Sequence, residues 1–398
     1  MGCINCGQLD IKFLIPISGG VVRLIYNYII VLNEKYEALG INPFLVSIYT
    51  YMGMILAFIP YLIFKYRTKH VVINSNNPDE LKDKSKLNVE LIFNNDILKK
   101  TKCSKYKCIV IASFFDFINT LLYGVLYTNI FYNLWIFDII FISLFSHIIL
   151  NTKLYKHQYM SMIIILILGF ALNLIEYFKL EGSENRFDYI GIIVKFLTEI
   201  FFSLAIVIIK YNLEKNYCSP YEICIWEGIL GLIFHLICLV VINCLELTID
   251  GIEYPKNIKY YFENYNYNDF IESLIVIITG GLYNISLILT CNYFSPWHIL
   301  IASIIKEYHL YLQKGGNVIL NIMGFFILFI ILFIFLVFVE VIELNICNIS
   351  YNTKKNIERR SKMDSYVDSF DENLNEESKE DEEDIMNSSS SSTNNENL

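Results

Sequence analysis

Ionisable side chains interrupt several long apolar runs of this sequence, and their chemistry decides what the runs could do. Placing a charged group in hydrocarbon costs about 3 kcal/mol or more, so such a residue usually faces the protein interior and serves a function. Acidic and basic side chains such as these can recognise charged groups and form ion pairs. The residues are Arg23, Asp116, Asp138, Lys195, Glu199, Glu227, His235, Lys306 and Glu307.

Four of these side chains are the best candidates for a substrate-binding cavity: Arg23, Asp116, Asp138 and Glu227. A guanidinium presents only hydrogen-bond donors, whereas an ionised carboxylate presents only acceptors. Arg23 therefore has two interpretations. It attracts an anionic substrate, or it neutralises Asp116 or Asp138.

Lys195 and Glu199 are spaced i, i+4, which places both side chains on one face of a helix. Pairing lowers the cost of burying both charges. The spacing leaves open whether the pair is purely structural or is a gate or proton-linked pair that breaks during transport.

Glycines mark places where helices could approach one another closely. Gly124, Gly228, Gly280 and Gly281 lie within or beside apolar runs. They would allow close helix contact or bending, and ordinary small-residue packing is the alternative.

Signatures of catalysis and metal binding were sought and not found. The sequence contains no GxSxG, HExxH or GxxxxGK[ST], and no GxGxxG after a strand. Cys3 and Cys6 form a lone CxxC, and His147, His298 and His309 lack metal-ligand spacing. We therefore expect no enzyme activity, cofactor or metal site.

Composition indicates a membrane protein. Of 398 residues 55% are hydrophobic and only 18% are charged, and the mean hydropathy is +0.45. The net charge of -9 belongs to the end of the chain, because residues 364–398 contain twelve acids and one lysine. These figures argue against a soluble nucleic-acid binder, a fibrous protein and a disulfide scaffold.

Ten apolar runs are long enough to be membrane spans, since a helix needs about 20 apolar residues to cross the hydrocarbon. The predicted fold class is thus all-α integral membrane. The predicted spans are 13–32, 43–64, 108–129, 131–150, 158–178, 189–210, 221–245, 273–291, 297–312 and 318–340.

Lys and Arg test this topology, because short loops rich in them stay cytosolic. With both termini cytosolic, the cytosolic segments contain 21 Lys and Arg and the opposite side contains six. Ten spans divide into five and five, and an odd-membered unit inserted twice gives two inverted repeats.

The predicted organisation follows from the spans. It comprises a cytosolic N-terminus (1–12), a first five-helix repeat (13–178) with a cytosolic loop (66–107), a non-cytosolic connection (179–188), a second repeat (189–345) with a non-cytosolic loop (246–272), and a disordered, acidic and Ser-rich cytosolic tail (346–398).

Four stretches of sequence resemble the drug/metabolite transporter superfamily, most closely the F branch of solute carrier 35 and the chloroquine-resistance-transporter-like proteins. They include ASFFDFINTLLYGVLYTNIF, with Asp116 near the start of the span and a break at Tyr123-Gly124, and SPYEICIWEGILG, with Glu227 followed by Gly228. The other two are FDIIFISLFSHIILNTKLYKHQYMSMIIILILGF and GFFILFIILFIFLVFVEVI. The resemblance covers roughly residues 13–345.

The resemblance implies a cavity lined by spans 1–4 and 6–9, with spans 5 and 10 as peripheral supports. It implies a secondary-active transporter or exchanger that moves a small polar or charged solute by alternating access. Asp138 stands where that branch usually has a polar, often basic residue, which argues against phosphate-style anion binding. A channel or receptor-like membrane protein without a transport cycle is the alternative.

The expected partners are a small-molecule solute and the lipid bilayer, with no nucleic acid; a homodimer is left open. An internal membrane (Golgi, ER or lysosome/vacuole) is the expected location, with the plasma membrane as the alternative.

Overall fold

The structure is a computed structural model that describes residues 4–6, 12, 14–32, 43–63, 65, 95–126, 134–179, 189–216, 218–244, 248–249, 252–253, 263, 267–308 and 318–344. Within these residues the fold is helical apart from two short two-stranded ribbons. The tail 346–398, predicted to be disordered, lies outside the described residues.

The helices of the first half of the chain are α1 (Leu14–Leu32), α3 (Pro43–Ile55), α6 (Asn95–Leu126), α7 (Asp138–Leu150) and α8 (Lys156–Lys179). Those of the second half are α9 (Tyr189–Lys215), α10 (Pro220–Cys244), α12 (Tyr267–Tyr293), α13 (Ile299–Glu307) and α15 (Val318–Phe338). A 3-10 turn precedes α7 (η2, Leu134–Phe137) and another precedes α13 (η3, Pro296–His298).

Each predicted span overlaps one of these helices, although α13 has only nine residues and two other helices begin earlier than predicted. Helix α6 starts at Asn95 and α12 at Tyr267, so each extends into a segment that was predicted to be a loop. The hydropathy of these first turns is low because they are polar, but polar residues such as Lys form good helices in water. The loop 246–272 also contains a small ribbon of β2 (Thr248–Ile249) and β3 (Ile252–Glu253).

Proline shapes several helix ends and one interruption. Pro43 begins α3 and Pro220 begins α10, positions where a missing N–H costs nothing. After α3 the chain makes a turn at Leu56 and Ala57 before becoming helical again at 58–63. The interruption lies where Pro60 would clash with the carbonyl of Leu56, four residues earlier.

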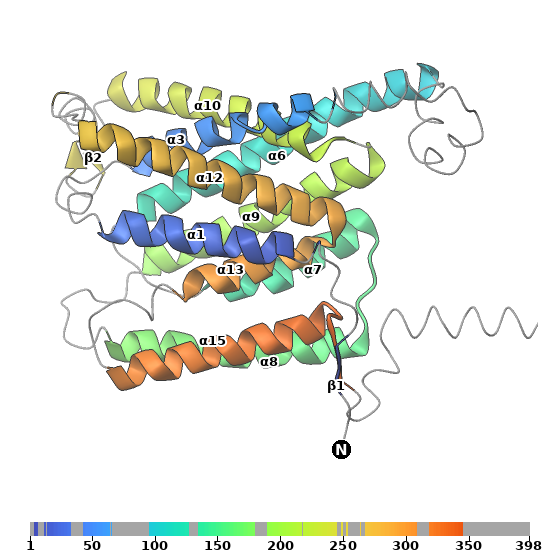
Figure 1. Cartoon of the computed structure of the whole chain (residues 1–398), viewed down its shortest axis with the longest axis vertical. Helices are drawn as coiled ribbons and strands as arrows, with labels where there is room; N and C mark the ends of the chain where they lie inside the picture. The colour runs from blue at the N-terminus through green and yellow to red at the C-terminus, as the bar shows by residue number, and fades with distance from the viewer. Residues whose placement is uncertain are drawn as a thin grey trace, which may run out of the picture.

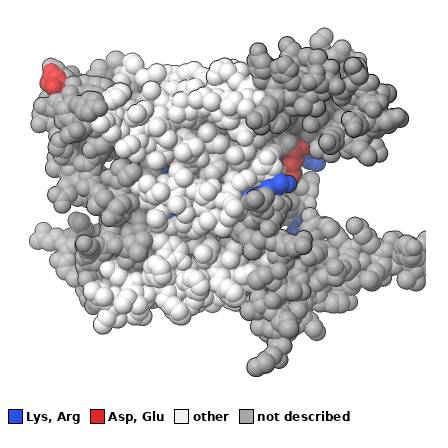
Figure 2. Space-filling view, in the orientation of Figure 1, with Lys and Arg blue, Asp and Glu red and all other residues white. Residues whose placement is uncertain are grey.

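Five of the described helices are long and apolar enough to cross a membrane. Their spans are Lys156–Ile175, Gly191–Lys215, Pro220–Val241, Ser273–Tyr293 and Val318–Phe338, and shorter apolar helical stretches are Leu14–Ile25, Ser47–Ile63 and Leu134–Leu150. Large apolar side chains face outward, for example Phe170 at 68% exposure and Ile319 at 67%. Figure 2 shows that the described surface between the helix ends is almost free of charged residues. The chain is a multi-pass membrane protein.

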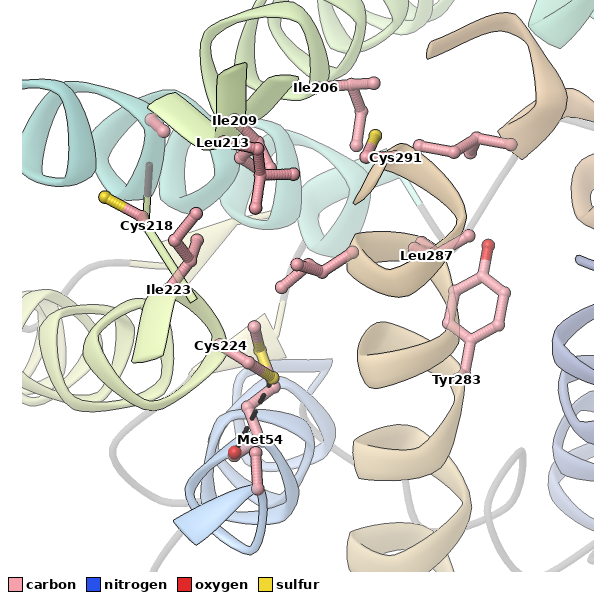
Figure 3. Packing of buried hydrophobic residues seen from close by; sticks show 14 of the residues in the cluster. Met54, Ile206, Ile209, Leu213, Cys218, Ile223, Cys224, Tyr283, Leu287 and Cys291 are labelled. Carbon is pink, nitrogen blue, oxygen red and sulfur yellow. Dashed lines mark hydrogen bonds between the residues drawn. The ribbon is translucent and has the colours of Figure 1, made fainter. Parts of the chain in front are cut away.

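The helices pack in a regular set of pairs. The extensive contacts are α6 with α9 and α10, α3 with α10 and α12, α1 with α12 and α13, α7 with α9, and α8 with α15. In Figure 1 the α8–α15 pair forms a layer of its own beside the other helices. One apolar core, which includes Trp135, Trp297 and Phe335, joins this layer to α7 and α13. A second core joins α3, α9, α10 and α12 (Figure 3).

A short antiparallel ribbon brings the two ends of the helical region together. Strand β1 (Ile4–Cys6) pairs with β4 (Ile342–Leu344), so residues before α1 lie beside residues after α15 (Figure 1). His157 at the start of α8 lies near the same place, with Nε2 3.3 Å from Oε1 of Glu340.

Candidate functional site

A hydrogen-bonded group connects α3 and α6 inside the bundle. The hydroxyl of Tyr51 on α3 donates to Oδ2 of Asp116 on α6 at 2.7 Å and lies 3.2 Å from Oγ1 of Thr120. Thr120 in turn donates to the backbone carbonyl of Asp116, one helical turn earlier. Tyr51 is only 2% exposed, and Asp116 is partly buried. The acid therefore lies in an apolar bundle with a phenol as its donor.

Helix α10 holds the Tyr51 ring in place. A Cβ atom at Gly231 would lie 2.3 Å from the ring, so the ring packs directly on the glycine backbone. The ring of His235 lies 5.0 Å from that of Tyr51, centroid to centroid, and Nδ1 of His235 is 2.9 Å from the carbonyl of Gly231. Since a carbonyl can only accept, Nδ1 must donate the hydrogen.

Glu227 brings a second carboxyl group to this region from α10. It is 3% exposed, and its Oε1 has no hydrogen-bond partner within the described part of the chain. It lies within electrostatic range of Asp116 and of Tyr51. A buried carboxyl oxygen without a donor is costly, and an ionisable residue in an apolar bundle is usually retained for a function. We call Tyr51, Asp116, Glu227 and His235 the central polar group.

Asp138 belongs to a separate polar cluster between α7 and α9. It is 2% exposed and accepts a hydrogen bond from Ser203 at 3.0 Å. Glu199 and Lys195 are close enough for their charges to act on it. Lys195 Nζ lies 2.6 Å from Oε1 of Glu199, as the i, i+4 spacing predicts. Sequence reasoning identified each of these residues except Ser203.

Arg23 lies against an aromatic ring of α12. Its guanidinium carbon is 4.9 Å from the centroid of the Tyr283 ring, a cation–π distance. Neither of the two roles predicted for Arg23, anion binding or neutralising Asp116 or Asp138, included this contact.

Glycines lie where helices cross. A Cβ at Gly281 would come within 2.3 Å of the Gly53 carbonyl oxygen, and one at Gly228 within 2.9 Å of the Tyr51 carbonyl oxygen. A Cβ at Gly280 would have more room, because its nearest atom, Thr50 Oγ1, would be 3.2 Å away. Gly124 lies near the end of α6. Sequence analysis missed Gly53, although its place within an apolar run was the available signal.

Polar side chains also connect four helices at one end of the bundle. Lys105 of α6 pairs with Glu222 of α10, with Nζ and Oε2 2.7 Å apart. Lys210 of α9 donates to the carbonyl oxygens of Cys291 and Phe294, at 2.7 Å each. Lys105, Lys210 and Glu222 lie near the ends of predicted spans, where sequence reasoning does not distinguish a contact from exposure to water.

A free thiol lies beside these contacts. Burial raises the pKa of Cys218 to about 12, against a partial lowering by the charge of Lys105. Its Sγ lies 3.4 Å from Oδ1 of Asn212. At neutral pH the thiol is therefore protonated and a poor nucleophile.

The described residues contain no group of three His, Cys, Asp or Glu side chains arranged to bind a metal ion. Comparison of the chain with models of known protein families and with curated proteins finds no match. The function of the protein must therefore be inferred from the geometry of the helices and their buried polar groups.

Proposed function

We propose that this protein is a secondary-active transporter or exchanger of the drug/metabolite transporter type. It would carry a small polar or charged solute across an internal membrane by alternating access. The observation that carries the proposal is the central polar group, which puts Asp116 of the first half of the chain near Glu227 of the second half. Carboxyl groups in an apolar bundle, one of them with an oxygen that lacks a donor, are typical of a solute or ion pathway.

The packing of the helices supports two inverted five-helix repeats. In chain order, the helices of the first half correspond to those of the second half as follows: α1 to α9, α3 to α10, α6 to α12, α7 to α13 and α8 to α15. Under this correspondence, the α6–α9 contact is equivalent to α1–α12, α3–α12 is equivalent to α6–α10, and α1–α13 is equivalent to α7–α9. Both members of each equivalent pair are packed in the structure. The α3–α10 and α8–α15 pairs map onto themselves. An internal twofold relation predicts this pattern.

The two 3-10 turns support the same correspondence. Trp135 lies in η2, directly before α7, and Trp297 lies in η3, directly before the matching helix α13. Both rings are buried, at 5% and 8% exposure, and both belong to the same apolar core. The likeness is conformational, since the flanking residues differ.

The β1–β4 ribbon supports an even number of crossings, because it joins the chain before the first helix to the chain after the last. Ten crossings satisfy this condition. Lys105 and Lys210 lie where α6 and α9 meet the start of α10 and the end of α12. The positive-inside rule assigns that basic end to the cytosol.

Close glycine crossings supply a physical route for movement. Where Gly53 meets Gly281 and Gly228 meets Tyr51, backbone lies against helix with few intervening side chains. Such surfaces can slide or rotate without large side-chain repacking. The α3–α10 and α3–α12 crossings lie between the proposed halves, so rocking would alter access to the central polar group.

Counterflow in liposomes tests the proposal. Purified protein would be reconstituted with a labelled solute chosen from compounds that differ between vesicles with and without the protein. We expect saturable counterflow, reduced at least about tenfold in Asp116→Asn and Glu227→Gln but not in Lys215→Ala, which lies on the exposed surface. Ohmic current would instead indicate a channel. Absence of counterflow for every differing compound would reject the transporter.

A further inference from the structure

Charged contacts at the basic end of the bundle join helices that lie far apart in sequence. The Lys105–Glu222 pair joins α6 to α10, and both side chains are about four-fifths buried, at 18% and 22% exposure. Burial alone would lower the pKa of Lys105, but the hydrogen bond and charge of Glu222 outweigh it, so the pKa is raised. Lys105 is therefore charged at physiological pH.

Lys210 makes the second contact, and it holds the end of α12. The last carbonyls of a helix lack partners within the helix, and a lysine can satisfy them. Lys210 donates to two such carbonyls, those of Cys291 and Phe294, and its Nζ lies 3.1 Å from Oε1 of Glu214. Its side chain is 10% exposed. One ammonium thus ties α9 to α12.

Asn212 of α9 makes a further contact with α6, next to the Lys105–Glu222 pair. Its Nδ2 donates to the backbone carbonyl of Lys105 at 3.4 Å, and its Oδ1 accepts from Asn216 at 2.6 Å. Lys105, Lys210, Asn212, Glu214 and Glu222 together form what we call the polar latch. It joins α6, α9, α10 and α12, which belong to both proposed repeats.

Two native thiols lie on the bundle side of the polar latch. Cys224 is 1% exposed and donates to the carbonyl of Met54, and Cys291 is 0% exposed beside the backbone that Lys210 holds (Figure 3). Glu227 lies within electrostatic range of both. An opening of the basic end between α10 and α12 should therefore expose these thiols to water.

We propose that the polar latch is the closed gate of the basic end, and that breaking it opens the way from that end to the central polar group. The inference rests on the proposed transport function, because a gate needs something to admit. Lys105 and Lys210 are positioning residues. They hold four helices together and do not contact the solute.

The accessibility of Cys224 and Cys291 tests the gate directly. The full chain in lipid nanodiscs would be treated with a membrane-impermeant methanethiosulfonate, and modification would be followed for each cysteine by peptide mass spectrometry. Both thiols should react slowly in the unmodified protein. Lys105→Ala and Lys210→Met should speed their modification at least about tenfold, by raising the population of an open minor state.

Three control measurements distinguish opening of the polar latch from other effects of the substitutions. The charge swap Lys105→Glu with Glu222→Lys should restore the slow rate, and Lys215→Ala, exposed on the last turn of α9, should not alter it. Cys238, further along α10, should keep its own rate, which separates local opening from unfolding. If Lys210→Met does not fold, the charge swap and Lys105→Ala decide alone. Unchanged thiol rates in the latch variants would overturn the gate.

Counterflow measured on the same preparations separates the two proposals. Normal counterflow with unchanged thiol rates would overturn the latch and leave the transporter. Faster thiol modification without counterflow of any solute would overturn the transport proposal. The polar latch would then be a structural contact that closes this end of the bundle.

Discussion

The hydroxyl of Tyr51 lies 2.7 Å from Oδ2 of Asp116, although the two residues are 65 positions apart in the chain. The contact connects two helices and gives a partly buried acid its donor. The Tyr51 ring rests on Gly231, so α3, α6 and α10 must pack correctly for this single hydrogen bond to form.

Tyr51→Phe removes the donor and leaves the ring. We expect the free energy of unfolding to fall by about 1–3 kcal/mol, because Asp116 then loses a buried partner. Solute counterflow by the reconstituted variant should also weaken. Thermal unfolding in detergent measures the first effect. Tyr159→Phe, on an exposed tyrosine of α8, is the matched control and should change neither quantity.

Gly281→Ala should destabilise the α3–α12 crossing. The added methyl would lie 2.3 Å from the Gly53 carbonyl oxygen, which is backbone and cannot rotate away. Overpacking of this kind lowers the free energy of unfolding by about 1–3 kcal/mol. Gly280→Ala is the control on the same helix, because its nearest atom is 3.2 Å away. An equal fall in melting temperature for both variants would contradict the crossing.

Lys195 and Glu199 lie 2.6 Å apart beside the buried Asp138. Removing one partner of a buried pair leaves an uncompensated charge and costs about 3–5 kcal/mol, whereas replacing both is far milder. We therefore expect Lys195→Met to lower the melting temperature more than the double variant Lys195→Met with Glu199→Gln. A double-mutant cycle of unfolding temperatures measures this. Additive effects would show that the pair contributes no coupling.

Cys218 should resist alkylation in the native protein. Its pKa of about 12 lies above the ordinary value of 9.0 because burial disfavours the thiolate. At pH 8 only about one thiol in ten thousand is then ionised. The folded state favours the protonated thiol, so the associated stability is complete below pH 9 and is lost as the pH rises toward 12. Iodoacetamide labelling from pH 7 to 10, native against denatured, checks the prediction.

The positions of the helices were largely predictable from the sequence, because bilayer thickness sets the length of apolar run that a crossing helix needs. The early start of α6 at Asn95 was missed because its first turns are polar. The Lys195–Glu199 contact was predictable for a different reason, since i, i+4 neighbours meet on any helix. Asp116, Glu227 and His235 of the central polar group could be listed from the sequence, but Tyr51 and the contacts among these residues could not.

Within this chain, the amino-acid sequence alone determined where apolar helices form and which of them carry charge, because both depend on neighbours along the chain. Only the tertiary structure decided that Asp116 meets Tyr51, that Gly53 meets Gly281, and that Lys210 holds the end of α12. Those contacts depend on how each helix is rotated and where it crosses the next. That choice is made by the packing of all the helices at once.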